Sequence, residues 1–197
     1  MNEQRGESIR VVHPLFHTEG GGSTPTSPLQ CRDLVFEQCA KSHAVRLVME
    51  WHSRLPNCQS GPWQFAFHAQ HAGLTYAVAL WNTPSGRCLP QHWLELRRMA
   101  CAPDAPKNTA SRFLAWMVRH FRRHHSVRER CISYQDTAVH TGTIYKAAGW
   151  TAEYVSKPRV RDRSAKRVGT QRDYRWNANG IEADASAKVR WEYAIKK

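Results

Sequence analysis

The sequence predicts an α/β (α+β) fold in which one mixed sheet is flanked by helices. The apolar period switches several times between two residues, typical of strands, and three to four, typical of amphipathic helices. The expected order is strand, helix, a strand hairpin, then strand, helix, strand, helix, strand, and a final strand. Strands that are joined through helices require a parallel pair within the sheet.

The first elements follow a lead-in, residues 1–30, whose Gly, Ser, Thr and Pro content cannot bury enough apolar area to offset chain entropy. We expect this segment to be flexible and one folded domain to span residues 31–197. Residues 31–39 (CRDLVFEQC) predict a strand. The next segment, KSHAVRLVMEWHSRLP, predicts a helix with Ser42 as its N-cap and Pro56 as its stop. Its apolar face comprises Ala44, Leu47, Val48 and Trp51.

A β-hairpin is predicted over residues 63–81, because WQFAFHAQ and LTYAVALW both alternate and HAG between them is a turn signal. After a loop, residues 92–101 (HWLELRRMAC) predict another strand, which carries charges. A helix then follows a Pro-containing loop, with Asn108 or Thr109 as its cap. Its apolar stripe comprises Ala110, Phe113, Leu114, Met117, Val118 and Phe121.

The C-terminal third alternates strands with a short helix. ERCISYQD (129–136) predicts a strand, and VHTGTIYKAA (139–148) a short helix that Gly149 closes as a left-handed C-cap. Residues 150–156 and 187–195 predict the last two strands.

A basic insertion, residues 156–186, separates these last two strands. The formal net charge of the chain is +13, which at 197 residues predicts a polyanionic partner such as nucleic acid. Arginines with nearby aromatic side chains suit a phosphate backbone and a stacked or flipped base; the alternative is a solvated insertion. The residues predicted to bind DNA are Arg159, Arg161, Arg163, Lys166, Arg167, Arg172, Tyr174, Arg175 and Trp176.

The sequence also argues against a membrane-spanning, secreted or disulfide-bonded protein. No apolar run is long enough for a transmembrane helix, and the N-terminus lacks the pattern of a secretory signal. The six cysteines include no Cys-x-x-Cys pair, which favours reduced thiols in a cytoplasmic protein.

The helix ending IYKAAGW resembles the Tyr-x-x-x-Gly-aromatic segment of the GCN5-related N-acetyltransferase superfamily. A more specific resemblance is to the Mom family of phage DNA-modification proteins, over about residues 40–155. The segments that carry it are EWHSRLP, LELRRMA, ISYQDT and VHTGTIYKAAGW. This resemblance implies an acetyltransferase-like fold and a transferase that converts adenine in DNA to N6-(carbamoylmethyl)adenine. Such an enzyme protects phage DNA from restriction in the host cytoplasm.

Three residues are candidates for catalysis. Tyr145 would hydrogen-bond a thioester sulfur or leaving group, as the resemblance implies, or would only pack on the sheet. Asp136 ends a predicted strand, where open α/β sheets bind ligands; it is a general base, a metal ligand or a cap of the next helix. His52, at the end of the first predicted helix, is a base or a ligand of iron, or it interacts with the helix dipole.

The expected cofactor is acetyl-CoA or a related acyl or glycyl donor. The loop DAPKNTAS stands where the superfamily binds pyrophosphate, but it lacks the usual glycines. A helix N-terminus still supplies free N–H groups, to which Lys107, Asn108, Thr109 and Ser111 add donors.

In the predicted strand 92–101, strict alternation sends Glu95 and Arg97 to one face of the sheet and Arg98 to the other. Arg98 would then hold a phosphate or carboxylate, or form a structural ion pair.

Simple acyl transfer cannot join a methylene carbon to N6, so two routes remain open. Either a C–H position of an acyl donor is activated, or a glycine-derived amine attacks C6 of adenine and displaces the original nitrogen. Both need the base outside the duplex, and Trp63, Tyr134, Tyr174 or Trp176 would supply an aromatic platform. Two other functions compete: an N-acetyltransferase that acts on a protein or small amine, and a non-enzymatic DNA-binding module.

Overall fold

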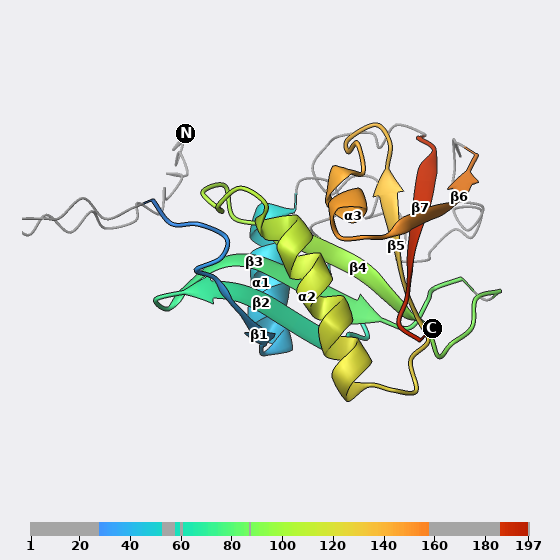
Figure 1. Cartoon of the computed structure of the whole chain (residues 1–197), viewed down its shortest axis with the longest axis horizontal. Helices are drawn as coiled ribbons and strands as arrows, with labels where there is room; N and C mark the ends of the chain where they lie inside the picture. Colours follow the sequence, from blue (N-terminus) through green and yellow to red (C-terminus); the bar gives the residue numbers. More distant parts are fainter. Residues whose placement is uncertain (1–27, 53–57, 60, 87, 158–185, 197) are drawn as a thin grey trace, which may run out of the picture.

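The residues that the structure describes form one seven-stranded sheet with helices on both faces (Figure 1). The computed structural model describes residues 28–52, 58–59, 61–86, 88–157 and 186–196. The strands are β1 (Val35–Gln38), β2 (Phe65–His71), β3 (Leu74–Asn82), β4 (Leu94–Cys101), β5 (Arg130–Asp136), β6 (Thr151–Ser156) and β7 (Lys188–Ala194). The helices are α1 (Lys41–Trp51), α2 (Thr109–His124) and α3 (Thr143–Ala147).

The strand order is β1-β2-β3-β4-β5-β7-β6. The pair β4–β5 is parallel, and the other five neighbouring pairs are antiparallel. This confirms the mixed sheet that the sequence predicts. The last strand, β7, inserts between β5 and β6, an arrangement that the order of elements along the chain does not reveal.

Helix α1 packs on one face of the sheet, against β2, β3 and β4, whereas α2 and α3 lie on the other face. The predicted stripe of α2 is the centre of the main core, with Phe113, Leu114, Met117, Val118 and Phe121 buried. Ala44, Leu47 and Val48 of α1 form the second core with β2–β4. Burial of these faces supplies most of the driving force for the fold.

The predicted N-cap at Ser42 is wrong, and the one predicted at Asn108 is right in position only. Helix α1 begins at Lys41, with Ala40 in the N-cap position and Ser42 inside the first turn, and no side chain caps it. In α2 the N-cap position is Asn108, in the left-handed region at φ 69°, and its side chain makes no capping hydrogen bond. The hydroxyl of Thr109 donates to the carbonyl of Pro106 at 2.6 Å instead. The predicted stop at Pro56 and the lead-in up to residue 27 lie outside the described residues.

A β-bulge in β4 overturns the predicted facing of its charges. Leu80 pairs with Arg98 but Trp81 pairs with Leu96, so Arg97 is the extra residue. Leu80 belongs to the core under α1, and Arg98 therefore lies on the α1 face of the sheet. Glu95 lies between Leu94 and Leu96 of the main core, so it also faces the α1 side.

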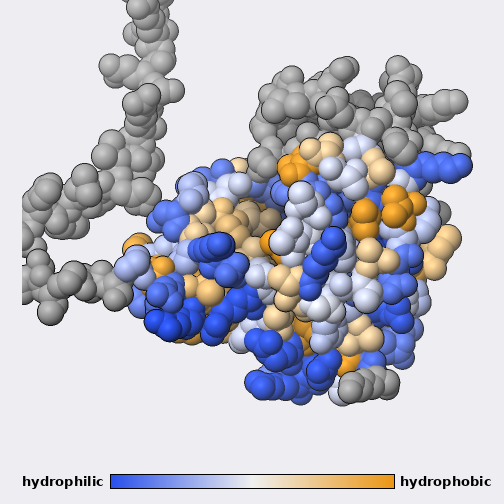
Figure 2. All heavy atoms as spheres, turned by 45° about the horizontal axis from the view of Figure 1, so that its top comes forward, coloured by the Kyte–Doolittle hydropathy of each residue, from blue (hydrophilic) through white to orange (hydrophobic). Residues whose placement is uncertain are grey.

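Figure 2 shows a face on which hydrophilic side chains predominate and hydrophobic ones form small, separate patches. Within the described residues, no helix is long and apolar enough to cross a membrane. All six cysteines are free thiols.

Candidate active site at the split between two parallel strands

The parallel strands β4 and β5 pair over three residues each, Leu94–Leu96 with Cys131–Ser133. Beyond Leu96 and Ser133 both strands continue, but no further pairing joins their described residues. We call this place the β4–β5 split. Strand ends that part in this way free backbone and side-chain groups for a ligand.

The hydroxyl of Tyr145 lies at this split. It is 2.9 Å from Ser133 Oγ, and Ser133 Oγ donates to the carbonyl oxygen of Leu96 at 3.4 Å. The Tyr145 ring stacks on Trp191, with centroids 5.3 Å apart and planes 10° apart. Burial raises the pKa of the Tyr145 phenol, against the opposing effect of the Ser133 hydrogen bond. The phenol is therefore protonated at neutral pH and can donate.

Glycine and a buried amide fix the segment that carries Tyr145. Gly142 has φ 77°, and a Cβ there would meet Gln135 Oε1 and the Trp191 ring, each at 2.6 Å. Gln135 Oε1 accepts a hydrogen bond from Trp191 Nε1 at 2.7 Å, and its Nε2 donates to the carbonyl of His140. Gly149 follows α3 with φ 78°, as predicted for the end of that helix.

Sequence reasoning did not single out Ser133, Gln135 or Trp191 as site residues. A usable signal was present, because alternation along β5 places Ser133 and Gln135 on the same face as the buried Cys131. Polar side chains in core-facing positions must find partners, and these two are joined to Tyr145 and Trp191.

On the α1 face, the structure brings together His52 and Arg98, two of the predicted site residues. His52 ends α1 at its C-cap position, where its backbone N–H donates to Val48 O at 2.9 Å. Burial, followed by the positive charges of Arg98 and His140, lowers the pKa of His52 to about 4. Its imidazole is neutral at pH 7 and does not act as a cation on the helix dipole. Arg98 Nη1 donates to the carbonyl of Arg97 at 2.6 Å.

Asp136 closes β5 and is joined to the segment before β7. Its Oδ1 accepts hydrogen bonds from the backbone N–H of Ala138 at 3.1 Å and from the hydroxyl of Ser186. Its Oδ2 lies 3.4 Å from Lys188 Nζ. Asp136 thus shapes the turn after β5, although α3 begins later, at Thr143.

The sequence predicts His52 and Asp136 as metal ligands, and the two residues have different neighbours. The charged groups that act on His52 are Arg98 and His140, and Asp136 is bonded to Lys188 and Ser186. In the part of the chain that the structure describes, no group of three or more His, Cys, Asp or Glu side chains is arranged to hold a metal ion. A neutral imidazole and a carboxylate are iron ligands in kind, so the iron role of this pair stays a prediction.

The predicted cofactor loop precedes α2. Lys107 and Asn108 are exposed, whereas Thr109 is buried. The hydroxyls of Thr109 and Ser111 donate to the carbonyls of Pro106 and Asn108. These hydroxyls are used within the turn, so the donors that remain for an anion are Lys107, the exposed side-chain amide of Asn108 and first-turn backbone N–H groups.

All nine predicted DNA-binding residues, from Arg159 to Trp176, lie outside the described residues. The two ends of the basic insertion are described. Ser156 pairs with Lys188 in the ladder, and Ser156 Oγ accepts a hydrogen bond from the Lys188 backbone N–H at 3.1 Å. Lys188 also pairs with Asp136 in the adjacent ladder. The insertion therefore leaves and rejoins the sheet beside Asp136.

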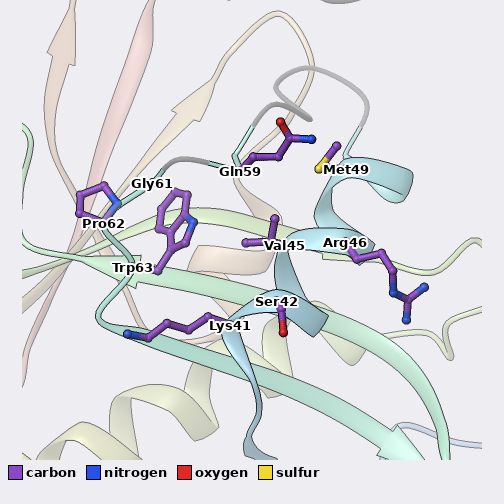
Figure 3. Close-up of a pocket in the computed structure, with 9 residues that line it drawn as sticks. All are labelled: Lys41, Ser42, Val45, Arg46, Met49, Gln59, Gly61, Pro62 and Trp63. Atoms are coloured by element: carbon purple, nitrogen blue, oxygen red, sulfur yellow. The ribbon is translucent and has the colours of Figure 1, made fainter.

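Of the predicted aromatic platform, Trp63 does not fit. It is 9% exposed, and its indole N–H donates to Cys58 O at 2.9 Å. Trp63 lines a pocket of about 610 Å³ between α1 and the segment before β2, to which Lys41 and Arg46 contribute (Figure 3). None of the predicted catalytic residues lines this pocket. Tyr134 is 38% exposed and stays a candidate, and Tyr174 and Trp176 lie outside the described residues.

A family model described as the Mom protein family matches residues 33–194 of this chain. The match spans every strand and helix that the structure describes, from β1 to β7. No curated protein matches the chain significantly.

Solved acetyltransferase structures share the fold. The ribosomal-protein-S18-alanine N-acetyltransferase of Escherichia coli matches with a TM-score of 0.55 at 8% identity, over 83% of this chain and 95% of that chain. A spermidine/spermine N-acetyltransferase from Vibrio cholerae matches with a TM-score of 0.56 at 8% identity, over 84% and 94%. An acetyltransferase from Salmonella typhimurium, solved with acetyl-CoA, matches with a TM-score of 0.55 at 9% identity, over 84% and 95%. The predicted acetyltransferase-like fold is confirmed.

Proposed function

Because the chain belongs to the Mom protein family, we propose that it is a DNA-modifying transferase that converts adenine to N6-(carbamoylmethyl)adenine and so protects phage DNA from restriction. The observation that carries this proposal is the position of the basic insertion. Its two ends meet the sheet beside Asp136, at the end of β5 where the β4–β5 split opens. A cationic segment at the mouth of a transferase site suits a polyanionic substrate.

The donor would lie in the β4–β5 split. A thioester there would meet the Tyr145 hydroxyl, which is protonated and hydrogen-bonded to Ser133. Tyr145 would donate a proton to the thiolate sulfur as an amine nitrogen displaces the thiol and forms the carboxamide; the bond to adenine is made separately, at the methylene carbon. First-turn N–H groups of α2 and the exposed Lys107 would bind the phosphates of a coenzyme A-type donor.

The adenine would approach from the α1 face, where His52 and Arg98 lie. Asp136 is the carboxylate that would accept a proton as the new bond forms. His52, with a pKa of about 4, is a weak base at neutral pH. Its neutral imidazole would therefore accept a hydrogen bond or bind iron rather than remove a proton.

The deciding experiment is mass spectrometry of nucleosides from the DNA of Escherichia coli cells that express this chain. Carbamoylmethylated deoxyadenosine is expected with the wild type and is expected to disappear with Tyr145→Phe. Unmodified DNA from cells that contain the folded wild-type protein would contradict the proposal.

Labelling the adenine separates the two routes. DNA is labelled with ¹⁵N at the exocyclic nitrogen before the chain is induced. Attack of a glycine-derived amine at C6 removes the label from the modified base, whereas alkylation of N6 by an activated donor carbon retains it.

An N-acetyltransferase is the second candidate, since a fold neighbour was solved with acetyl-CoA. It predicts that the purified chain binds acetyl-CoA and releases free thiol with a polyamine or a peptide N-terminus as acceptor. Thiol release with these acceptors, together with unmodified DNA, would favour this function.

A further inference from the structure

One row of side chains crosses three strands on the sheet face that α1 leaves uncovered. Tyr134 of β5 pairs directly with Arg190 of β7, and Arg190 pairs with Tyr154 of β6. Directly paired residues point to the same face, so the three side chains form one row: tyrosine, arginine, tyrosine. Ser133, next to Tyr134, points to the opposite face and bonds Tyr145.

The row is accessible. Helix α1 packs on β2, β3 and β4, and no described helix covers β5, β7 or β6 on this face. Tyr134 is 38% exposed and Tyr154 is 51% exposed. The two tyrosine side chains and the arginine between them therefore form an exposed surface that a ligand can reach.

The arginine is fixed between the two rings. Its guanidinium lies over the Tyr154 ring, 5.4 Å from the centroid, and its Nε is 2.7 Å from the buried carboxylate of Glu192. Arg130 binds the same carboxylate from the other side. Partial burial raises the pKa of the Tyr134 phenol, and a hydrogen bond with Arg190 acts in the opposite direction. Glu95 also acts on Tyr134 but is paired with Arg97, so the two arginines around Glu192 leave one surplus positive charge beside the rings.

We propose that this row, Tyr134–Arg190–Tyr154, is a stacking platform for the bases of extruded or single-stranded DNA. Tyrosine rings and a guanidinium plane stack on any base, and the surplus positive charge suits the phosphates. Tyr134 adjoins the β4–β5 split and holds the target adenine. Tyr154 lies two strand spacings away, about 10 Å, and holds a neighbouring base.

This inference rests on the proposed function for the identity of the base, but its test uses neither donor nor turnover. A single-stranded dT₁₂ oligonucleotide with one central 2-aminopurine, an adenine analogue whose fluorescence is quenched by stacking, is titrated with the purified chain. Anisotropy of an end label gives the affinity, and the 2-aminopurine signal gives the stacking.

We expect quenching with the wild type and with Tyr134→Phe, which keeps the ring. Tyr134→Leu should abolish the quenching and weaken binding about tenfold, and Tyr154→Leu should weaken binding by a similar factor. Tyr134→Gln is a second ring-free variant in case Leu perturbs the strand. Val155→Ala, at the exposed neighbour of Tyr154 in β6, is the matched control and should bind like the wild type.

Wild-type affinity and quenching in both folded ring-free Tyr134 variants would overturn the platform, whatever the nucleoside analysis shows. Conversely, loss of quenching in a chain that leaves DNA unmodified would support the platform and contradict only the proposed reaction.

Discussion

The Tyr145 hydroxyl lies 2.9 Å from Ser133 Oγ, at the point where β4 and β5 stop pairing. Tyr145 comes from α3 and Ser133 from β5, and stacking on Trp191 of β7 holds the Tyr145 ring in place. Residues of α3, β5 and β7 thus place the Tyr145 hydroxyl at the β4–β5 split. Substitutions of that phenol and of the groups around it distinguish a role in chemistry from a role in packing alone.

Tyr145→Phe removes the hydroxyl and keeps the ring on Trp191. The lost buried hydrogen bond should lower the free energy of unfolding by about 1 kcal/mol. DNA modification should fall at least about 100-fold, because a proton donor is lost. Ser133→Ala breaks the same hydrogen bond but keeps the phenol, so it should cost similar stability and less activity. Full modification by folded Tyr145→Phe would show that Tyr145 only packs.

Asp136→Asn keeps an oxygen that can accept from Ala138 N–H and from the Ser186 hydroxyl, but it loses the charge. The partner Lys188 is about half exposed, so the free energy of unfolding should fall by about 1 kcal/mol or less. Modification, measured by nucleoside mass spectrometry, should fall at least about 100-fold. Lys188→Gln removes the ion pair and leaves the carboxylate. If the two variants have equal activity, the role of Asp136 is structural.

His52 should make the protein less stable in mild acid. Its pKa is about 4 in the folded chain against about 6.5 when unfolded, so between these values the unfolded state binds more protons. Stability is fully present above pH 6.5 and is lost as the pH falls toward 4. At pH 5 the loss from this group is about 2 kcal/mol.

The measurement for His52 is urea unfolding of the wild type and of His52→Gln at pH 5 and pH 7. Other histidines with lowered pKa, such as His43 and His120, contribute equally to both proteins. The variant should therefore lose about 2 kcal/mol less than the wild type between these pH values. Equal losses would contradict a buried, neutral His52.

Gly142→Ala should be much more harmful than Gly73→Ala. Both glycines have positive φ, 77° and 81°, so each alanine pays a similar backbone strain of about 1–2 kcal/mol. Only at Gly142 would the new Cβ meet Gln135 and Trp191, whereas at Gly73 nothing lies within 4 Å. Thermal denaturation should show Gly142→Ala clearly below Gly73→Ala. Equal melting temperatures would mean that the Gln135–Trp191 contact is soft.

The basic insertion should carry the salt dependence of DNA binding. Replacing Arg159, Arg161 and Arg163 together by Gln should reduce the slope of log affinity against log salt by about 2 for single-stranded DNA. Arg32→Gln, an exposed arginine before β1, is the control and should leave the slope unchanged. An unchanged slope in the triple variant would place the phosphate contacts elsewhere.

Much of the fold could be predicted because its signals are local. Alternation marks β2 and β3, and the apolar stripe marks α2, since burial of one face imposes a period on the sequence. The parallel pair follows from a helix between two strands. Capping was predicted less well at Ser42 and Asn108, because several polar residues near a helix start can cap it and the backbone chooses among them.

Of the candidate site, the sequence alone singles out Tyr145, Asp136 and the basic insertion as predictions, since each stands in a recognisable segment. Only the tertiary structure decided that Arg98 shares the α1 face with His52, because a bulge of one residue reverses alternation along β4. It alone also decided that β7 enters between β5 and β6, and so aligned Tyr134, Arg190 and Tyr154. Register between distant strands depends on how whole faces are buried together, and no local pattern encodes it.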